Sequence, residues 1–135
     1  YSPKEGIENA FVLDINAFEP IKSDNNTNIL LFSNSTTKAK PVILDVGLYR
    51  VAIKAKSLPE APINNENAHL TIDMNGKKIG AYFVSEKKEE TNYFQFQITK
   101  KQEVTIGLTF GNDLVLDNLD RNLLVFSVVI EKVKK

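Results

Sequence analysis

The sequence has 135 residues, of which 42% are hydrophobic and 25% are charged, and this is the size and composition of a single globular domain. Seventeen lysine and arginine residues balance 17 aspartate and glutamate residues, which excludes the basic footprint of a protein that binds nucleic acid or an anionic membrane. The chain has no cysteine and a single histidine, His69. This excludes disulfides, thiol nucleophiles, cysteine-based zinc sites and histidine-rich metal sites.

The chain starts at Tyr1 and not at Met, and no apolar run reaches the length of a membrane span. We interpret residues 1–8 as a linker-like segment and residues 9–135 as one domain. The sequence has the character of a processed protein or an excised domain, so we expect it to be attached to other domains of a longer protein.

Apolar residues alternate with polar ones through most of the chain, which is the pattern of half-buried strands. In chain order the pattern predicts strands over residues 11–17, 29–32, 42–46, 49–55, 70–74, 79–83, 94–98, 104–110 and 123–130. In the fifth and sixth of these, Leu70 and Ile72 form one face, and Ile79, Ala81 and Phe83 form another. The sequence therefore predicts an all-β fold, an antiparallel β-sandwich of about nine strands.

The sequence also predicts how some of these strands are connected. Asn75-Gly76 offers the positive φ values that a two-residue type I′ hairpin requires. Residues 57–67, with two prolines and three asparagines, are expected to form a long loop. Residues 123–130 are apolar at almost every position, which is typical of a central strand covered on both faces.

Acidic and amide side chains concentrate between the last two predicted strands. Three aspartates and three asparagines fall within the eleven residues 112–122. Calcium prefers clustered oxygen ligands of this kind, although the segment lacks the Asp-x-Asp-x-Asp-Gly spacing of an EF-hand. Asx residues in turns also bond their own backbone, so the composition leaves both a calcium site and a purely structural turn open.

The two ends of this segment carry a family resemblance. Phe110-Gly111-Asn112-Asp113, a short insert, and Asp120-Arg121-Asn122-Leu123 resemble the C-terminal signature of the calcium-dependent xylan-binding-type carbohydrate-binding modules. Gly47-Leu48-Tyr49 and the hairpin over residues 73–80 are similar to further parts of that pattern, and the order of elements matches from Pro41 to Lys135. The resemblance implies a jelly-roll-like β-sandwich that serves as an accessory domain of secreted polysaccharide-degrading enzymes.

The resemblance also implies the residues of a calcium site. The expected ligands are Asp113, Asp120, Asp117 and Asn112. The two aspartates of the motif would hold the ion, whereas Asp117 lies in the variable insert and Asn112 would supply an amide oxygen or orient the loop. Asn122 has the same orienting role. Arg121 is expected to contact the ligand or to bond neighbouring carboxylates bidentately, which would pin the loop without a metal.

The chain departs from the family pattern in two ways. Leu124 and Phe126 stand where the family commonly has an aromatic residue and an acidic residue. The chain also has no tryptophan, the residue that would offer a large platform to the apolar face of a sugar. Tyr82 and Tyr93, near the ends of strands or loops, are therefore the candidate carbohydrate contacts.

We expect a non-catalytic module that recognises a polysaccharide or oligosaccharide with the help of calcium, in a secreted, periplasmic or cell-surface protein. The alternative is a structural or adhesion β-sandwich of such a protein, without sugar binding, in which the Asp/Arg cluster is a metal-free clasp. A small hydrolase is the third hypothesis, but no activated serine pattern accompanies His69 and no two carboxylates are spaced as a glycosidase pair. Neither nucleic acid nor a membrane is expected as a partner.

Overall fold

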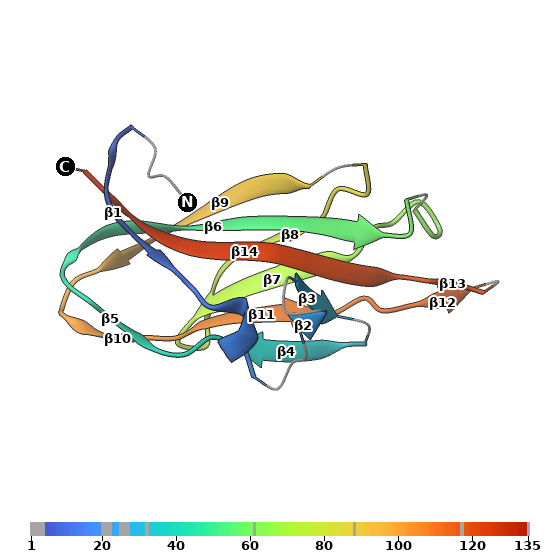
Figure 1. Cartoon of the computed structure of the whole chain (residues 1–135), viewed down its shortest axis with the longest axis horizontal. Coiled ribbons are helices and arrows are strands. Elements are labelled where there is room, and N and C mark those ends of the chain that lie inside the picture. Colours follow the sequence, from blue (N-terminus) through green and yellow to red (C-terminus); the bar gives the residue numbers. More distant parts are fainter. Residues whose placement is uncertain are drawn as a thin grey trace.

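Figure 1 shows the computed structural model of the chain, which describes residues 5–19, 23–24, 28–31, 33–60, 62–87, 89–116 and 118–134. These residues are largely in antiparallel strands, and this confirms the predicted all-β sandwich. The part of the chain that is described contains no helix of the length and apolarity needed to cross a lipid bilayer.

The elements follow one another in this order: β1 (Ile7–Val12), the short 3-10 helix η1 (Ile15–Ala17), β2 (Ser23–Asp24), β3 (Asn28–Leu31), β4 (Ser35–Lys38), β5 (Val42–Leu44), β6 (Gly47–Leu58), β7 (His69–Met74), β8 (Lys77–Phe83), β9 (Glu90–Ile98), β10 (Gln102–Val104), β11 (Ile106–Phe110), β12 (Val115–Leu116), β13 (Leu119–Asp120) and β14 (Asn122–Val133).

Two sheets form the layers of the sandwich. The larger has the order β2-β3-β14-β6-β9, with β1 also paired to β14, and the smaller has the order β4-β11-β7-β8. In Figure 1, β6 and β14 run side by side along the long axis of the molecule, with β7 and β11 behind and below them. The core lies between the layers, where the inward residues of both sheets are fully buried; examples are Val51, Ile53, Leu70, Ile72 and Leu108.

Strand β14 is the centre of the larger sheet, as its apolar sequence predicts. It pairs with β6 from Asn122 to Lys132 on one edge. On its other edge it pairs first with β3 and then with β1. A β-bulge between Val125 and Ser127 shifts the register, so Val125 and Val128 both face the core.

The N-terminal part differs from the sequence-based prediction. β1 begins at Ile7, inside the segment expected to be a linker, and ends at Val12 rather than continuing to Ala17. Residues 15–17 form a 3-10 helix because the Asp14 side chain accepts a hydrogen bond of 2.9 Å from the Asn16 backbone N–H. A period of two over four apolar residues could not reveal this local cap.

The middle of the chain follows the prediction more closely. Asn75 and Gly76 have φ values of 52° and 84°, which confirms the two-residue hairpin between β7 and β8. Strand β6 runs on to Leu58, two residues into the predicted loop, because Ser57 and Leu58 pair with Leu123 and Asn122 of β14.

A close approach between the two sheets depends on Gly80 of β8. Gly80 pairs with the fully buried Ile72, so it lies on the core side of its sheet. A Cβ atom built on Gly80 would lie only 2.1 Å from the Phe94 ring, which comes from β9 of the opposite sheet. The absence of a side chain therefore makes room for Phe94 between the layers.

We expect Gly80→Ala to lower the free energy of unfolding by about 1–3 kcal/mol, because the ring and the backbone must move apart. The matched control is Gly111→Ala, since a Cβ at Gly111 has no atom within 4 Å. Urea unfolding of both variants measures the difference, and equal stabilities of the two would contradict this packing.

Candidate functional site

Arg121 joins three segments at one end of the sandwich. Its side chain is buried, with 4% of the residue exposed, between β13 and β14. Nη1 donates to the backbone carbonyl of Asn112 at 2.6 Å, and Nη2 donates to the carbonyl of Ile63 at 2.9 Å. The Glu66 carboxylate lies 3.4 Å from Nη1. The guanidinium therefore ties the loop before β7 to the segment after β11, and we call this set of contacts the Arg121 clasp.

Asn112 reinforces the clasp from the other side. Its Oδ1 accepts a hydrogen bond of 2.7 Å from the His69 backbone N–H, and its Nδ2 donates to the carbonyl of Asn67 and to Glu66, at 2.8 and 2.9 Å. The sheet brings these residues together, because Phe110 at the end of β11 pairs with Leu70 at the start of β7. Asn112 thus acts as an orienting residue, one of the two roles expected from the sequence.

The expected calcium ligands that the structure describes form no metal-binding cluster. Within the described residues, no group of three or more Asp, Glu or His side chains is close enough to hold a metal ion. Asp113 donates its backbone N–H to Asn34 Oδ1 at 2.7 Å, and its own Oδ1 is buried without a hydrogen-bond partner in the described structure. Asp120 is exposed on β13. Asp117 lies outside the described residues.

The remaining residues of the motif contact the backbone. With its amide oriented to satisfy both neighbours, Asn122 donates from Nδ2 to Asp120 Oδ2 at 3.3 Å and to the Arg121 carbonyl at 3.0 Å. Among the described residues, Arg121 bonds two carbonyls and Glu66, and not the neighbouring Asp120. One partner of Arg121, Asn112, belongs to the motif, but Glu66 and Ile63 lie 55 and 58 positions away in the chain and could not be predicted from it.

A pocket lies next to the clasp. It is lined by Pro62, Asn65, Glu66, Asn67, Phe83 and Glu86, and we call it the Phe83 pocket. The Phe83 side chain is 59% exposed, and the His69 ring packs edge-on against it, with 4.8 Å between ring centroids. An exposed aromatic ring supported by a second ring is a preformed surface for an apolar ligand face.

The polar rim of this pocket consists of hydrogen-bond acceptors held in place. Asn67 Nδ2 donates to Glu86 Oε2 at 2.6 Å, and this bond is the main reason why the pKa of Glu86 lies below its usual value. Asn67 Oδ1 is buried and has no hydrogen-bond partner among the described residues. Glu66 is held by Asn112 and Arg121. The pocket thus presents carboxylate oxygens beside an aromatic ring.

The sequence pattern did not reveal Phe83 as an exposed residue, because it predicted the wrong face of β8 for this side chain. The strict alternation of residues 79–83 placed Phe83 with Ile79 and Ala81 on an inward face. A register shift between Ile72 and Asp73 inserts an irregularity into the ladder, so Tyr82 pairs with the buried Leu70 and faces inward. Phe83 pairs with His69 and faces outward. The Phe83-His69 pairing could be found only once the register was known.

The two tyrosines expected as sugar contacts lie elsewhere. The Tyr82 hydroxyl is buried without a partner in the described part of the chain, its ring packs on Phe94 at 5.3 Å, and burial raises its pKa. Tyr93 lies on the outer face of the larger sheet, where the Arg50 guanidinium stacks 4.2 Å from its ring centre. Arg50 also donates from Nε to the buried Glu131 at 2.5 Å. Neither tyrosine lines the Phe83 pocket.

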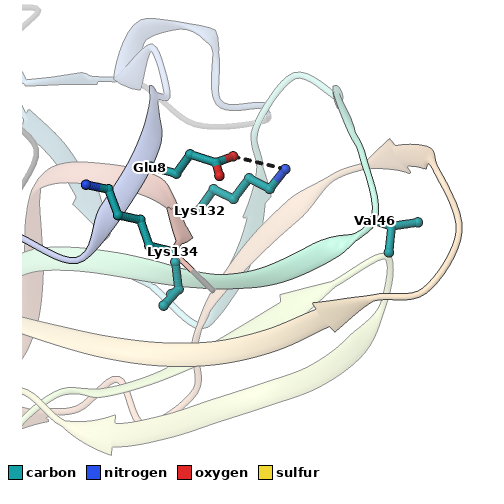
Figure 2. A pocket seen from close by; sticks show the side chains of 5 residues that line it. Glu8, Val46, Lys132 and Lys134 are labelled. Atoms are coloured by element: carbon teal, nitrogen blue, oxygen red, sulfur yellow. Dashed lines mark ion pairs between the residues drawn. The ribbon is translucent and has the colours of Figure 1, made fainter.

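A second pocket lies where β1 and the end of β14 approach the turn before β6. It is lined by Glu8, Val46, Lys132, Val133 and Lys134. Figure 2 shows Glu8 and Lys132 pointing toward each other, and their charged atoms are 3.3 Å apart. Its described lining offers no aromatic surface, so we favour the Phe83 pocket as the ligand site.

Comparison with known proteins shows the fold of this chain. No family model matches the chain, and no curated protein sequence matches it. Solved structures do match. The CBM36-1 domain of a multidomain xylanase from the hindgut metagenome of Trinervitermes trinervoides has a TM-score of 0.61 and 14% identity, over 94% of this chain and 99% of its own.

Two further structures agree with this match. The C-terminal CBM6 domain of the laminarinase LamC from Zobellia galactanivorans has a TM-score of 0.61 and 11% identity, over 92% of this chain and 100% of its own. A carbohydrate-binding module CBM36 in complex with calcium and xylotriose has a TM-score of 0.50 and 10% identity, over 90% and 97% of the two chains. At these identities the similarity shows that the chain has the fold of carbohydrate-binding modules.

We expect Arg121→Lys to lower the free energy of unfolding by about 2–4 kcal/mol, because lysine keeps the charge but cannot bond both carbonyls from one planar group. Glu66→Gln is the matched variant and should cost less than about 1 kcal/mol, since this partner is half exposed and the contact is long. Chemical unfolding compares the two. A larger loss from Glu66→Gln would show that the ion pair, and not the carbonyl bonds, holds the clasp.

Proposed function

We propose that this chain is a non-catalytic carbohydrate-binding module and that it binds sugar in the Phe83 pocket. The observation that carries the proposal is the exposed Phe83 ring, backed by His69 and bordered by Glu66, Asn67 and Glu86. Sugars present an apolar C–H face and a polar edge of hydroxyl groups. An aromatic ring with acceptors at its rim matches both features.

The acids of the pocket are unsuited to glycoside hydrolysis. Hydrolysis needs one carboxylic acid whose raised pKa keeps it protonated, together with a second carboxylate across the sugar. The pKa of Glu86 is lowered by its bond from Asn67, and Glu66 is held by Asn112 and Arg121. Both carboxylates are therefore engaged as hydrogen-bond acceptors, which supports a binding role and not a catalytic one.

Calcium assistance does not fit the donor set of the described residues. Calcium takes about six to eight oxygen ligands. The Oδ1 atom of Asn112 already accepts from His69, Asp113 Oδ1 is buried, and the described residues contain no group of three or more acidic or histidine side chains that could hold a metal ion. We therefore propose that the Arg121 clasp holds the loop in this chain and that sugar binding does not depend on calcium.

The setting of the module is inferred from the proteins with the same fold. Two of them are domains of a xylanase and a laminarinase, which are enzymes that act on polysaccharides. We propose that this chain likewise belongs to a longer secreted, periplasmic or cell-surface protein and directs it to a polysaccharide.

A structural or adhesion role is the second candidate, and one observation favours it. The short β12–β13 hairpin extends from one end of the molecule (Figure 1) and exposes Val115, Leu116 and Leu119 at 64%, 40% and 47%. An exposed apolar tip is typical of a contact with another protein. If no glycan binds, this hairpin becomes the surface to test.

We expect Phe83→Ala to weaken binding of the best ligand in a panel of xylan, β-glucan and laminarin oligosaccharides about tenfold or more, because the stacking surface is lost. Ile43→Ala is the control, since Ile43 is similarly exposed, at 64%, and lies outside the pocket lining. Isothermal titration measures both, and melting temperatures confirm folding. Unchanged affinity in Phe83→Ala would place the sugar elsewhere.

Excess calcium and excess chelator should give melting temperatures within about 1 °C of each other and equal glycan affinities, because no ion contributes to the native state. Differential scanning calorimetry measures the first quantity and titration the second. A calcium-dependent rise of several degrees, abolished by Asp113→Ala, would overturn the metal-free clasp.

A further inference from the structure

The described lining of the Phe83 pocket is rich in hydrogen-bond acceptors. Two of its described lining residues, Glu66 and Glu86, are acidic, and none of them is basic. Asn67 lines the same pocket, and its Nδ2 holds Glu86 in place. Carboxylates accept hydrogen bonds and donate none, so the rim is matched to ligand groups that donate.

The amide groups at the rim do not change this balance. Both amide hydrogens of Asn112 are directed to Glu66 and the Asn67 carbonyl, and the Asn67 amide donates to Glu86. Among the described lining residues, the side-chain donors that remain are the Asn65 amide and the second amide hydrogen of Asn67. A ligand carboxylate or sulfate would therefore meet mainly other acceptors.

The two acidic residues of the pocket, Glu66 and Glu86, differ in whether a cationic side chain pairs with them. Glu66 is paired with Arg121, which offsets its charge. Glu86 accepts from the neutral Asn67 amide, and the nearby Lys87 contributes only a minor part of the lowering of its pKa. Glu86 is thus the acid best placed to pair with a cationic group on a bound sugar.

From this arrangement we infer the sugar class: the Phe83 pocket selects sugars that donate hydrogen bonds, prefers amino sugars with a free ammonium group over neutral sugars, and rejects uronic acids. This inference rests on the proposed sugar binding at Phe83. The ring takes the apolar face of the sugar, and Glu86 bonds an ammonium or hydroxyl group at its edge.

The preference among neutral, amino and acidic sugars can be tested with three β-1,4-linked hexasaccharides that share one backbone. They are cellohexaose, its 2-amino counterpart hexaglucosamine, and its 6-carboxylate counterpart hexaglucuronate. We expect hexaglucosamine to bind about threefold to fivefold more tightly than cellohexaose, the range of an exposed charge pair. Hexaglucuronate should bind more weakly than both. Titration calorimetry of the intact chain at fixed ionic strength gives the three affinities.

Two glutamate variants distinguish recognition of the amino sugar in the Phe83 pocket from nonspecific attraction of cations to the protein. Glu86→Gln should make hexaglucosamine and cellohexaose equal, whereas Glu103→Gln, which removes an exposed acid on β10, should leave the ratio unchanged. Phe83→Ala should weaken both ligands. Competition by hexalysine as strong as that of hexaglucosamine, or a ratio that survives Glu86→Gln, would overturn the inference.

The outcomes also separate this inference from the function on which it rests. If cellohexaose binds through Phe83 while hexaglucosamine binds no better or hexaglucuronate binds as well, the sugar class is wrong and the binding role stands. If none of the three binds and the wider glycan panel also fails, both are wrong.

Discussion

The contacts of the Arg121 guanidinium organise the end of the sandwich that we propose binds sugar. Two backbone carbonyls, from Ile63 and Asn112, and the Glu66 carboxylate converge on one buried cation. Carbonyl groups buried away from water need a donor, and arginine provides several in one plane. The loop that carries Glu66 and Asn67 is thereby fixed against the end of β11, which places these side chains beside Phe83.

The second constraint is the register of β7 and β8. One irregularity in this ladder decides that Tyr82 packs toward Phe94 while Phe83 faces outward against His69. A shift of one residue exchanges the faces of a strand. The proposed ring surface therefore depends on the same packing that seats Phe94 against Gly80 in the core.

The sequence was a good guide to the sheets and a partial guide to the site. Alternation predicted the buried faces of β6, β7 and β11 because burial of apolar side chains dominates those strands. It failed at residues 15–17, where a side-chain cap decides, and at Phe83, where a ladder irregularity decides. Arg121 and its partner Asn112 belong to the motif, but the other two partners, Ile63 and Glu66, are brought to Arg121 only by the tertiary fold.

The central claim, that sugar is held beside the clasp on Phe83, is tested most directly by mapping a bound glycan on the chain. A titration with cellohexaose and hexaglucosamine, followed by backbone and aromatic NMR shifts, should perturb Phe83, His69, Asn67 and Glu86 first and most. Shifts concentrated at Tyr93 and Arg50, or at Asp113 and Asp120 only when calcium is added, would contradict it.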